Sequence, residues 1–253
     1  MHRRAWASEF IGTTILLFVE VIVVRLLFEP DSAIAQRVPG LPARLALIGL
    51  VTAALLALLI VSPIGQSSGG HFNPAVTVTL WLVRGLPGRD AVAFVLAQLL
   101  GSVAGVLLAR AALGSVVAHP HVNYAVIQPA RGWSDVSVFI GEAVSITVLM
   151  TAVMLFLTRP AMVRWTPAVV AIAVGVLIVV GGLTSGGCFN PARQLGPALL
   201  ARQWEHLWAY LIGPVAGSVI VGTVFRMTGR ERPITCGLCG HPPADLPPAG
   251  SRR

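Results

Sequence analysis

The stretch SSGGHFNPAVT at residues 67–77 decides how this chain folds, because a near copy, TSGGCFNPARQ, occupies residues 184–194. Each copy contains the pattern of a helix start. Asn is a favoured N-cap residue, whose side chain accepts from a free backbone N–H, and Pro is favoured at the first helical position. In a water-soluble protein these would be two ordinary caps. Their role here depends on the solvent that surrounds them.

The composition is that of a membrane protein. Of 253 residues, 55% are hydrophobic and 11% are charged, and the mean hydropathy is +0.81. Long apolar runs alternate with short clusters of Pro, Gly and Arg, and about 20 residues are enough for a helix to cross a bilayer core. Helices are expected because every backbone polar group must be satisfied within the protein at that depth. Six such runs lie at residues 5–27, 41–61, 91–113, 136–157, 165–183 and 207–225.

The first of these runs allows a second interpretation. Arg3 and Arg4 precede it, and SAIAQ follows at residues 32–36, which is the arrangement of a cleaved signal peptide. Two acids, Glu9 and Glu20, interrupt the apolar stretch, and Glu9 has a counterpart in the second half of the chain. We therefore interpret the run as the first membrane span.

Two shorter apolar segments directly follow the repeated phrase, at residues 73–83 and 190–201. At 1.5 Å per residue each is about 15 Å long, so neither crosses a bilayer alone. Placed end to end, two such half-helices fill about 30 Å, which is one bilayer core.

The two halves of the chain share one plan. SEFIGTTILLF, from Ser8, matches GEAVSITVLMT, from Gly141, and AQLLGSVAG, from Ala97, matches AYLIGPVAG, from Ala209. Each half has three spans, an odd number, so the second half enters the membrane upside down and the two half-helices enter from opposite faces. The predicted fold is an all-α membrane protein with six transmembrane helices, two re-entrant half-helices and an inverted repeat, at about residues 1–115 and 134–226.

The arginines are distributed by side. With both ends of the chain in the cytoplasm, eleven of the 18 Lys and Arg residues fall in cytoplasmic segments, as the positive-inside rule requires of a multi-pass protein of the cell membrane. The net charge of +8 does not indicate a nucleic-acid partner, because no aromatic-rich basic face accompanies it. The eleven are Arg3, Arg4, Arg84, Arg89, Arg159, Arg164, Arg226, Arg230, Arg232, Arg252 and Arg253.

The two helix starts are expected to meet near the bilayer midplane. There the amides of Asn73 and Asn190 and two positive helix-dipole ends favour an electron-rich oxygen and disfavour cations. Polar groups at membrane depth cost free energy, so these are expected to be functional. The remaining motif residues are Pro74, Ala75, Pro191 and Ala192.

The paired Asn-Pro-Ala phrases, the Arg after the second one, and EFIGT at residues 9–13 together resemble the aquaporin family, the major intrinsic proteins, up to about Arg226. The resemblance implies a channel domain over residues 1–226, embedded in the lipid bilayer as a homotetramer without a cofactor. It also implies that Asn73 and Asn190 bind the oxygen of a permeating molecule and that Arg193 lines a narrower filter on the extracellular side.

The repeat gives an independent reason to single out Arg193, because the first half-helix has Val76 at the same position. A charge therefore breaks the symmetry of the two copies inside the membrane. The alternative is a structural arginine paired with an acid, but no acid lies nearby in the sequence.

Counting from the motif asparagines, the resemblance places the other filter residues at Ala53, Ile178 and Gly187. Water-selective members have a bulky aromatic residue and a His at the first two positions. This chain has neither, so we expect a wide filter with one apolar side. Such a filter resembles that of aquaglyceroporin-like members that carry metalloid hydroxides. The hydroxyls of these solutes suit Arg193, the two Asn amides and the loop carbonyls of Gly186, Gly187 and Cys188.

We therefore predict a passive channel for small neutral solutes, namely boric acid and arsenite, with glycerol and some water. Gln194 and Ala198 depart from the glycerol-facilitator pattern, but a glycerol facilitator or water channel of the same family is an alternative. The alternative from another class is an inverted-repeat secondary transporter. It needs a coupling carboxylate beside the substrate, and the acids in the spans do not flank the Asn motifs in the sequence. The sequence does not indicate an enzyme, because it has no nucleophile and base grouped at a plausible spacing.

Several further residues are assigned supporting roles. Glu9 and Glu142 are expected to hydrogen-bond the buried loops, and His71 to orient the first loop. Glu20 and Arg25 are explained only by pairing or by contacts between subunits. Gly101, Gly105, Gly213 and Gly217, at small-xxx-small spacing, predict close helix packing.

The segment at residues 227–253 is predicted to be a Pro-rich, disordered cytoplasmic tail. Its CGLCGH stretch contains Cys236, Cys239 and His241, three residues that leave a zinc site incomplete. Binding of arsenite or a metal by the two thiols is the functional alternative to an incidental pair.

Overall fold

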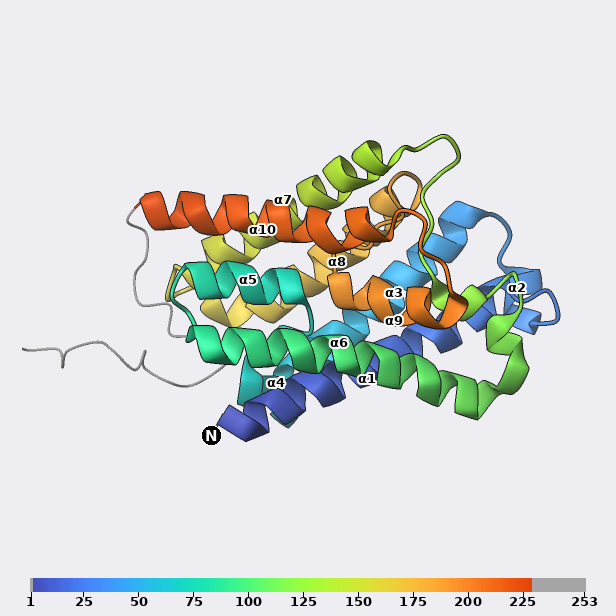
Figure 1. Ribbon diagram of the computed structural model, residues 1–253, viewed down its shortest axis with the longest axis horizontal. Coiled ribbons are helices and arrows are strands. Elements are labelled where there is room, and N and C mark those ends of the chain that lie inside the picture. Colours follow the sequence, from blue (N-terminus) through green and yellow to red (C-terminus); the bar gives the residue numbers. More distant parts are fainter. Residues whose placement is uncertain (1, 229–253) are drawn as a thin grey trace, which may run out of the picture.

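The computed structural model describes residues 2–228, and within them all regular structure is helical (Figure 1). Among these residues, six helices are long and apolar enough to cross a membrane, which confirms the predicted spans. Cys236, Cys239 and His241 lie outside the described residues, so their predicted role stays a prediction. The six helices are α1 (His2–Phe28), α3 (Leu41–Val61), α6 (Gly88–Leu113), α7 (Asp135–Leu157), α8 (Thr166–Gly182) and α10 (Leu207–Met227).

The two predicted half-helices are α5 (Pro74–Leu82) and α9 (Pro191–Ala201), with 9 and 11 residues. In Figure 1 they occupy different halves of the bundle along its long axis, α5 towards the end where α1 begins and α10 finishes, and α9 towards the other end. Each is too short to span a bilayer, and together they are long enough to do so.

Five short helices, which the sequence did not predict, fill the turns. They are α2 (Ala33–Arg37), α4 (Pro63–Ser68) and the 3₁₀-helices η1 (Gly114–Ala118), η2 (Asn123–Ala125) and η3 (Val163–Trp165). Helix α4 begins at an ordinary cap, because Ser62 Oγ accepts from the backbone N–H of Ile64 at 3.2 Å. It leads the chain from α3 into the first buried loop.

Packing follows the repeat. Helix α1 packs along α6 in the first half, and α7 packs along α10 in the second. A Cβ atom added to Gly101 would lie 2.5 Å from the carbonyl oxygen of Phe10, and one added to Gly217 would lie 2.2 Å from that of Ala143. Gly105 and Gly213 face neighbouring backbone in the same way. The predicted close helix packing at all four glycines is confirmed.

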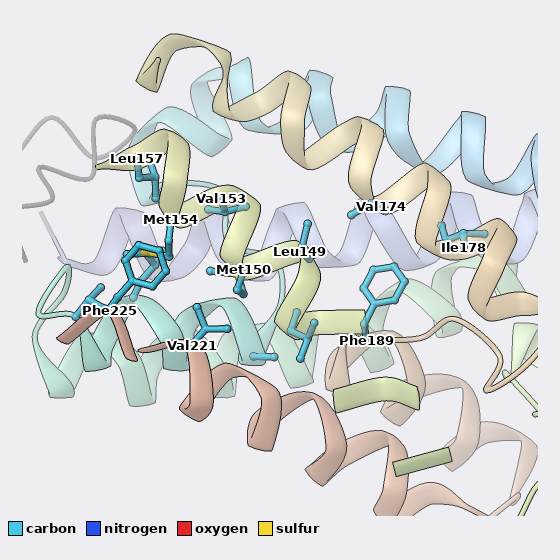
Figure 2. Close-up of a cluster of buried hydrophobic side chains, with 14 of the residues drawn as sticks. Leu149, Met150, Val153, Met154, Leu157, Val174, Ile178, Phe189, Val221 and Phe225 are labelled. Carbon is cyan, nitrogen blue, oxygen red and sulfur yellow. The ribbon is translucent and has the colours of Figure 1, made fainter. Parts of the chain in front are cut away.

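The two halves are joined by their half-helices. Helix α5 packs on α10 and α9 packs on α6, so each half-helix lies against the other repeat. A buried apolar cluster, which Figure 2 shows in part, ties α7, α8 and α10 together. It includes Ile178 and Phe189, so apolar packing fixes the positions of two side chains next to the site.

The outer faces of the bundle are apolar as well. Leu50, Leu58 and Ile172 are each about two-thirds exposed, and many other large apolar side chains on the long helices are similarly uncovered. Such an apolar surface is expected where the solvent is lipid.

Candidate functional site

The two Asn-Pro-Ala phrases cap the two half-helices. Asn73 Oδ1 accepts from the backbone N–H of Ala75 at 2.8 Å, and Asn190 Oδ1 accepts from those of Ala192 at 3.0 Å and Arg193 at 3.3 Å. Because each Asn side-chain oxygen is used in capping, each amide nitrogen points away from its own helix.

The amide nitrogens connect the two loops. Asn73 Nδ2 donates to the carbonyl oxygen of Phe189, and Asn190 Nδ2 donates to that of Phe72, both at 3.0 Å. The structure therefore brings the two helix starts together, cap to cap. Since an amide nitrogen carries two hydrogens, each Asn has a second donor besides this bond.

The first loop is held by a buried carboxylate. Glu9, on α1, accepts from Ser68 Oγ at 2.6 Å and from the backbone N–H groups of His71 at 3.0 Å and Phe72 at 2.7 Å. It also accepts from Gln98 Nε2, on α6, at 2.7 Å. These bonds satisfy backbone donors that have no water available at this depth.

The second loop is held in the same way by Glu142, on α7. This carboxylate accepts from Ser185 Oγ at 2.7 Å, from the backbone N–H of Cys188 at 3.2 Å and from that of Phe189. Phe72 and Phe189 both have a positive φ, of 45° and 34°. For a bulky residue this conformation is strained, and the surrounding bonds must stabilise it.

His71 lies in the first loop next to Asn73. Its Nδ1 is 3.0 Å from Thr77 Oγ1, and its ring packs edge-on against Phe94 at 5.2 Å between centroids. These contacts fix the orientation of the imidazole. Within residues 2–228, no group of three or more His, Cys, Asp or Glu side chains is placed to hold a metal ion.

A cavity of about 450 Å³ runs past both asparagines. Its wall on α3 consists of Leu41, Leu45, Ile48, Thr52, Leu56 and Ile60, which cover nearly the whole helix. The loop residues Gly186, Gly187 and Cys188 line it as well. The site is thus an elongated cavity with a largely apolar wall and a small number of polar groups.

Three of the four predicted filter residues, Ile178, Gly187 and Arg193, line this cavity. The fourth does not. The wall contains Thr52 in place of Ala53, whose Cβ instead lies 3.4 Å from where a Cβ on Gly175 of α8 would be. The placement of Ala53 in the filter is therefore corrected by one residue, because the wall of α3 follows the four-residue spacing through Ile48, Thr52 and Leu56.

Arg193 has two partners from distant parts of the chain. Its Nη1 donates to the carbonyl oxygen of Ala125 at 2.8 Å, and its Nη2 lies 3.6 Å from Glu20 Oε2. Thr52 Oγ1 donates to the other oxygen of Glu20 at 2.5 Å. The alternative left open by the sequence, an arginine paired with an acid, is therefore present in the structure, and the acid comes from α1, far away in the sequence.

The acids of the spans lie closer to the site than their positions in the sequence indicate. Glu9 and Glu142 bind the loops that carry the Asn motifs, and Glu20 lines the cavity, so distance along the chain does not exclude a transporter. The signal for Glu20 was present in the sequence, as an acid within an apolar span. Its partners were not.

The connector between the repeats, residues 114–134, also reaches the site, which no sequence pattern indicated. Gln194 Oε1 accepts from the backbone N–H of Ile127 at 3.1 Å, and Gln194 Nε2 donates to the carbonyl of the same residue at 2.9 Å. Asn123, Tyr124 and Ala125 have φ values of 41°, 54° and 59°. This irregular backbone directs the Ala125 carbonyl towards Arg193.

Comparison with known proteins places these features in a family. Residues 1–225 match the family model described as major intrinsic protein. Aquaporin-8 from Rattus norvegicus is 31% identical over 240 residues, covering 89% of this chain and 84% of the relative. Probable aquaporin NIP7-1 from Arabidopsis thaliana is 32% identical over 225 residues, covering 88% and 76%.

A third relative is glycerol uptake facilitator protein-like 6 from Lactiplantibacillus plantarum, which is 29% identical over 234 residues, covering 90% of this chain and 99% of the relative. Among solved structures, the aquaglyceroporin from Plasmodium falciparum superposes with a TM-score of 0.74 at 19% identity, covering 89% of this chain and 96% of that one. At this identity the likeness supports the fold alone.

Proposed function

The chain belongs to the major intrinsic protein family, and we propose that it is a passive channel for small uncharged solutes. The main solutes in this proposal are metalloid hydroxides such as boric acid and arsenite, and glycerol and some water also pass. The observation that carries the proposal is the make-up of the cavity wall beside Arg193. Where water-selective members are expected to have a bulky aromatic residue and a His, this wall has Thr52 and Ile178. Thr52 is smaller than an aromatic residue, which leaves room for solutes larger than water, and Ile178 makes the other position apolar.

Transport in this proposal proceeds by exchange of hydrogen bonds. A solute loses part of its hydration beside Arg193 and the carbonyls of Gly186 and Gly187, and then reaches the second amide hydrogens of Asn73 and Asn190. Each step replaces bonds to water with bonds to fixed groups, so no single position binds tightly. Neither a covalent intermediate nor an energy source is required.

The placement in the membrane is part of the proposal. The chain is a multi-pass membrane protein, and we assign it to the cell membrane with both ends in the cytoplasm, so that Arg193 lies towards the outside. We further propose a homotetramer with one pore in each subunit. The arginine distribution supports the orientation.

The experiment is an uptake panel in proteoliposomes that contain the full chain, with empty liposomes as the control. Water, glycerol, urea, boric acid and arsenite are compared by stopped-flow light scattering. Glycerol and boric acid are expected to enter well above the rate of empty liposomes. Rapid entry of water alone would contradict the wide-filter proposal and leave a water channel.

A second candidate function is favoured by one observation, the carboxylate of Glu20 in the cavity. An inverted-repeat secondary transporter needs such a group for coupling. Accumulation of glycerol or boric acid against its gradient, driven by a proton or sodium gradient, would establish the transporter. Uptake that stops at equal concentrations and does not depend on either gradient supports the channel.

A further inference from the structure

Glu20 forms a charge pair inside the cavity, and this inference about it rests on the proposed function. Its side chain is 5% exposed and lies within the membrane-spanning helix α1, where an isolated charge would be costly. One of its oxygens lies 3.6 Å from Arg193 Nη2, on α9, and the other accepts from Thr52 Oγ1, on α3. Three helices therefore contribute to one arrangement in the wall.

The negative charge of Glu20 balances the positive charge of Arg193 in the cavity wall. Among the described residues that line it, Glu20 is the only carboxylate and Arg193 the only guanidinium. The remaining ionisable side chains of the lining are His71, which is bonded to Thr77, and His121 and Cys188. No second acid in the lining is placed to compensate Arg193.

Without that compensation the cavity would be positive. The N-termini of α5 and α9 meet beside it, and each contributes a partial positive charge, to which Arg193 adds a full one. Helix N-termini together with an arginine form a typical anion site. The carboxylate of Glu20 cancels the arginine charge at short range, so only the weaker helix dipoles remain.

We propose that Glu20 is a specificity-determining residue, which neutralises Arg193 so that the pore accepts uncharged solutes and rejects anions. In this proposal Thr52 is a positioning residue, which holds the carboxylate towards Arg193 through its hydroxyl. The pair also offers a passing hydroxyl group an acceptor next to a donor. A neutral solute that both donates and accepts hydrogen bonds, such as a polyol or a metalloid hydroxide, suits this wall.

The test compares four variants of the full chain in proteoliposomes, with nitrate and glycerol as probes. Glu20→Gln keeps the shape of the side chain and removes its charge, so nitrate flux is expected to rise about tenfold over the unmodified chain, as a difference of one charge in a buried site implies. Thr52→Val is expected to raise it less. The double variant Glu20→Gln with Arg193→Gln should return nitrate flux to the original level, because no net charge remains.

Glu29→Gln is the matched control. Glu29 is a buried acid that follows α1, lies outside the cavity lining and sits 3.1 Å from His119. Its loss is expected to leave nitrate flux unchanged. If Glu20→Gln passes no more nitrate than this control, or loses water, glycerol and nitrate flux in equal proportion, Glu20 has only a structural role and the inference is wrong.

Two readouts separate this inference from the proposed function. Glycerol entry through the unmodified chain tests the function, and the gain of nitrate flux tests the charge pair without requiring glycerol to pass. Should Glu20→Gln fail to insert into liposomes, unchanged nitrate flux in Thr52→Val, with the protein present in the membrane, overturns the inference.

Discussion

The two buried loops, residues 67–73 and 184–190, are alike in their support and different in the half-helix that each one leads into. Each is held by one carboxylate, each has a Phe with positive φ, and each ends at an Asn that caps a half-helix and donates to the other loop. After the cap, the first half-helix continues with Val76 and the second with Arg193. The scaffold is therefore built twice, while the charged part of the site is built once.

The supports also differ in one detail. Glu9 accepts from four donors, the fourth being Gln98 on α6. The corresponding residue of the second repeat is Tyr210 on α10, which donates to the Ser185 carbonyl at 2.5 Å and not to the carboxylate, so one side chain, Ser185, donates to Glu142 where two donate to Glu9. In the first repeat Gln98 supports the loop by bonding to the carboxylate that holds it. In the second repeat Tyr210 bonds directly to a carbonyl of the loop.

The largest expected effect comes from removing the carboxylates. Glu9→Gln places an amide where four donors converge, so we expect a loss of about 3 kcal/mol or more in the free energy of unfolding, since charge-assisted bonds are lost and buried donors lose their acceptor. Glu142→Gln should cost somewhat less, because one side chain donates to Glu142 and two donate to Glu9. Thermal unfolding in detergent measures both.

Glu29→Gln provides the control for loss of a buried acid outside the loops, and it should unfold close to the unmodified chain. If Glu142→Gln is the more damaging of the two loop variants, the number of side-chain donors does not determine how strongly each loop is held.

The next variant removes the charge that distinguishes the two half-helices. Arg193→Val makes the second half-helix resemble the first and leaves the Glu20 carboxylate uncompensated. Sodium flux is expected to increase about tenfold, because the cavity then carries a buried negative charge. Arg193→Val is thus expected to admit cations, whereas Glu20→Gln is expected to admit anions.

Sodium-sensitive dye in proteoliposomes measures this flux, and Val76→Leu, a change at the matching position of the first half-helix, is the control. Sodium exclusion as complete as in the unmodified chain would show that the two half-helices exclude cations without the arginine.

A smaller effect tests the cavity wall. Thr52→Phe narrows the space beside Arg193 and Ile178→His makes another part of the wall polar, so glycerol flux should fall about fivefold while water still passes, since pore width and lining polarity set selectivity. Stopped-flow light scattering gives both rates. Ala53→Phe is the matched change one residue away.

This matched variant is expected to crowd α8 near Gly175, and so to lower the amount of folded protein without changing the ratio of glycerol to water flux. If Ala53→Phe changes the ratio of glycerol to water flux and Thr52→Phe does not, Ala53 lines the filter, as counting along the sequence predicted.

The parts of this fold that follow local rules were predictable from the sequence. Apolar length defines the six spans, and Asn before Pro defines the two half-helices. The matching of the repeats singled out Glu9 and Glu142 as a pair, and the spacing of Gly101 and Gly105 predicted close helix packing. In each case the physical cause is contained within one helix or one repeated segment.

The parts that depend on how helices rotate against one another were not predictable. A shift of one residue turns a helix by about 100°, which is why counting gave Ala53 where the wall has Thr52. The pairing of Glu20 with Arg193 joins α1 to α9 and has no counterpart in the repeat. The Ala125 carbonyl depends on consecutive left-handed residues without a Gly, which no turn rule predicts.

The smallest expected effect concerns the two tyrosines of the chain. Tyr210 is fully buried, and its replacement by Phe leaves the Ser185 carbonyl without this donor, so we expect a loss of about 1 kcal/mol in the free energy of unfolding. Tyr124→Phe is the matched control. It removes a bond from Arg110, which keeps its contact with the ring at 5.8 Å and is exposed to solvent, so a smaller loss is expected. Thermal unfolding ranks the two variants, and an equal or larger effect at Tyr124 would mean that the second loop does not depend on Tyr210 as the first depends on Gln98.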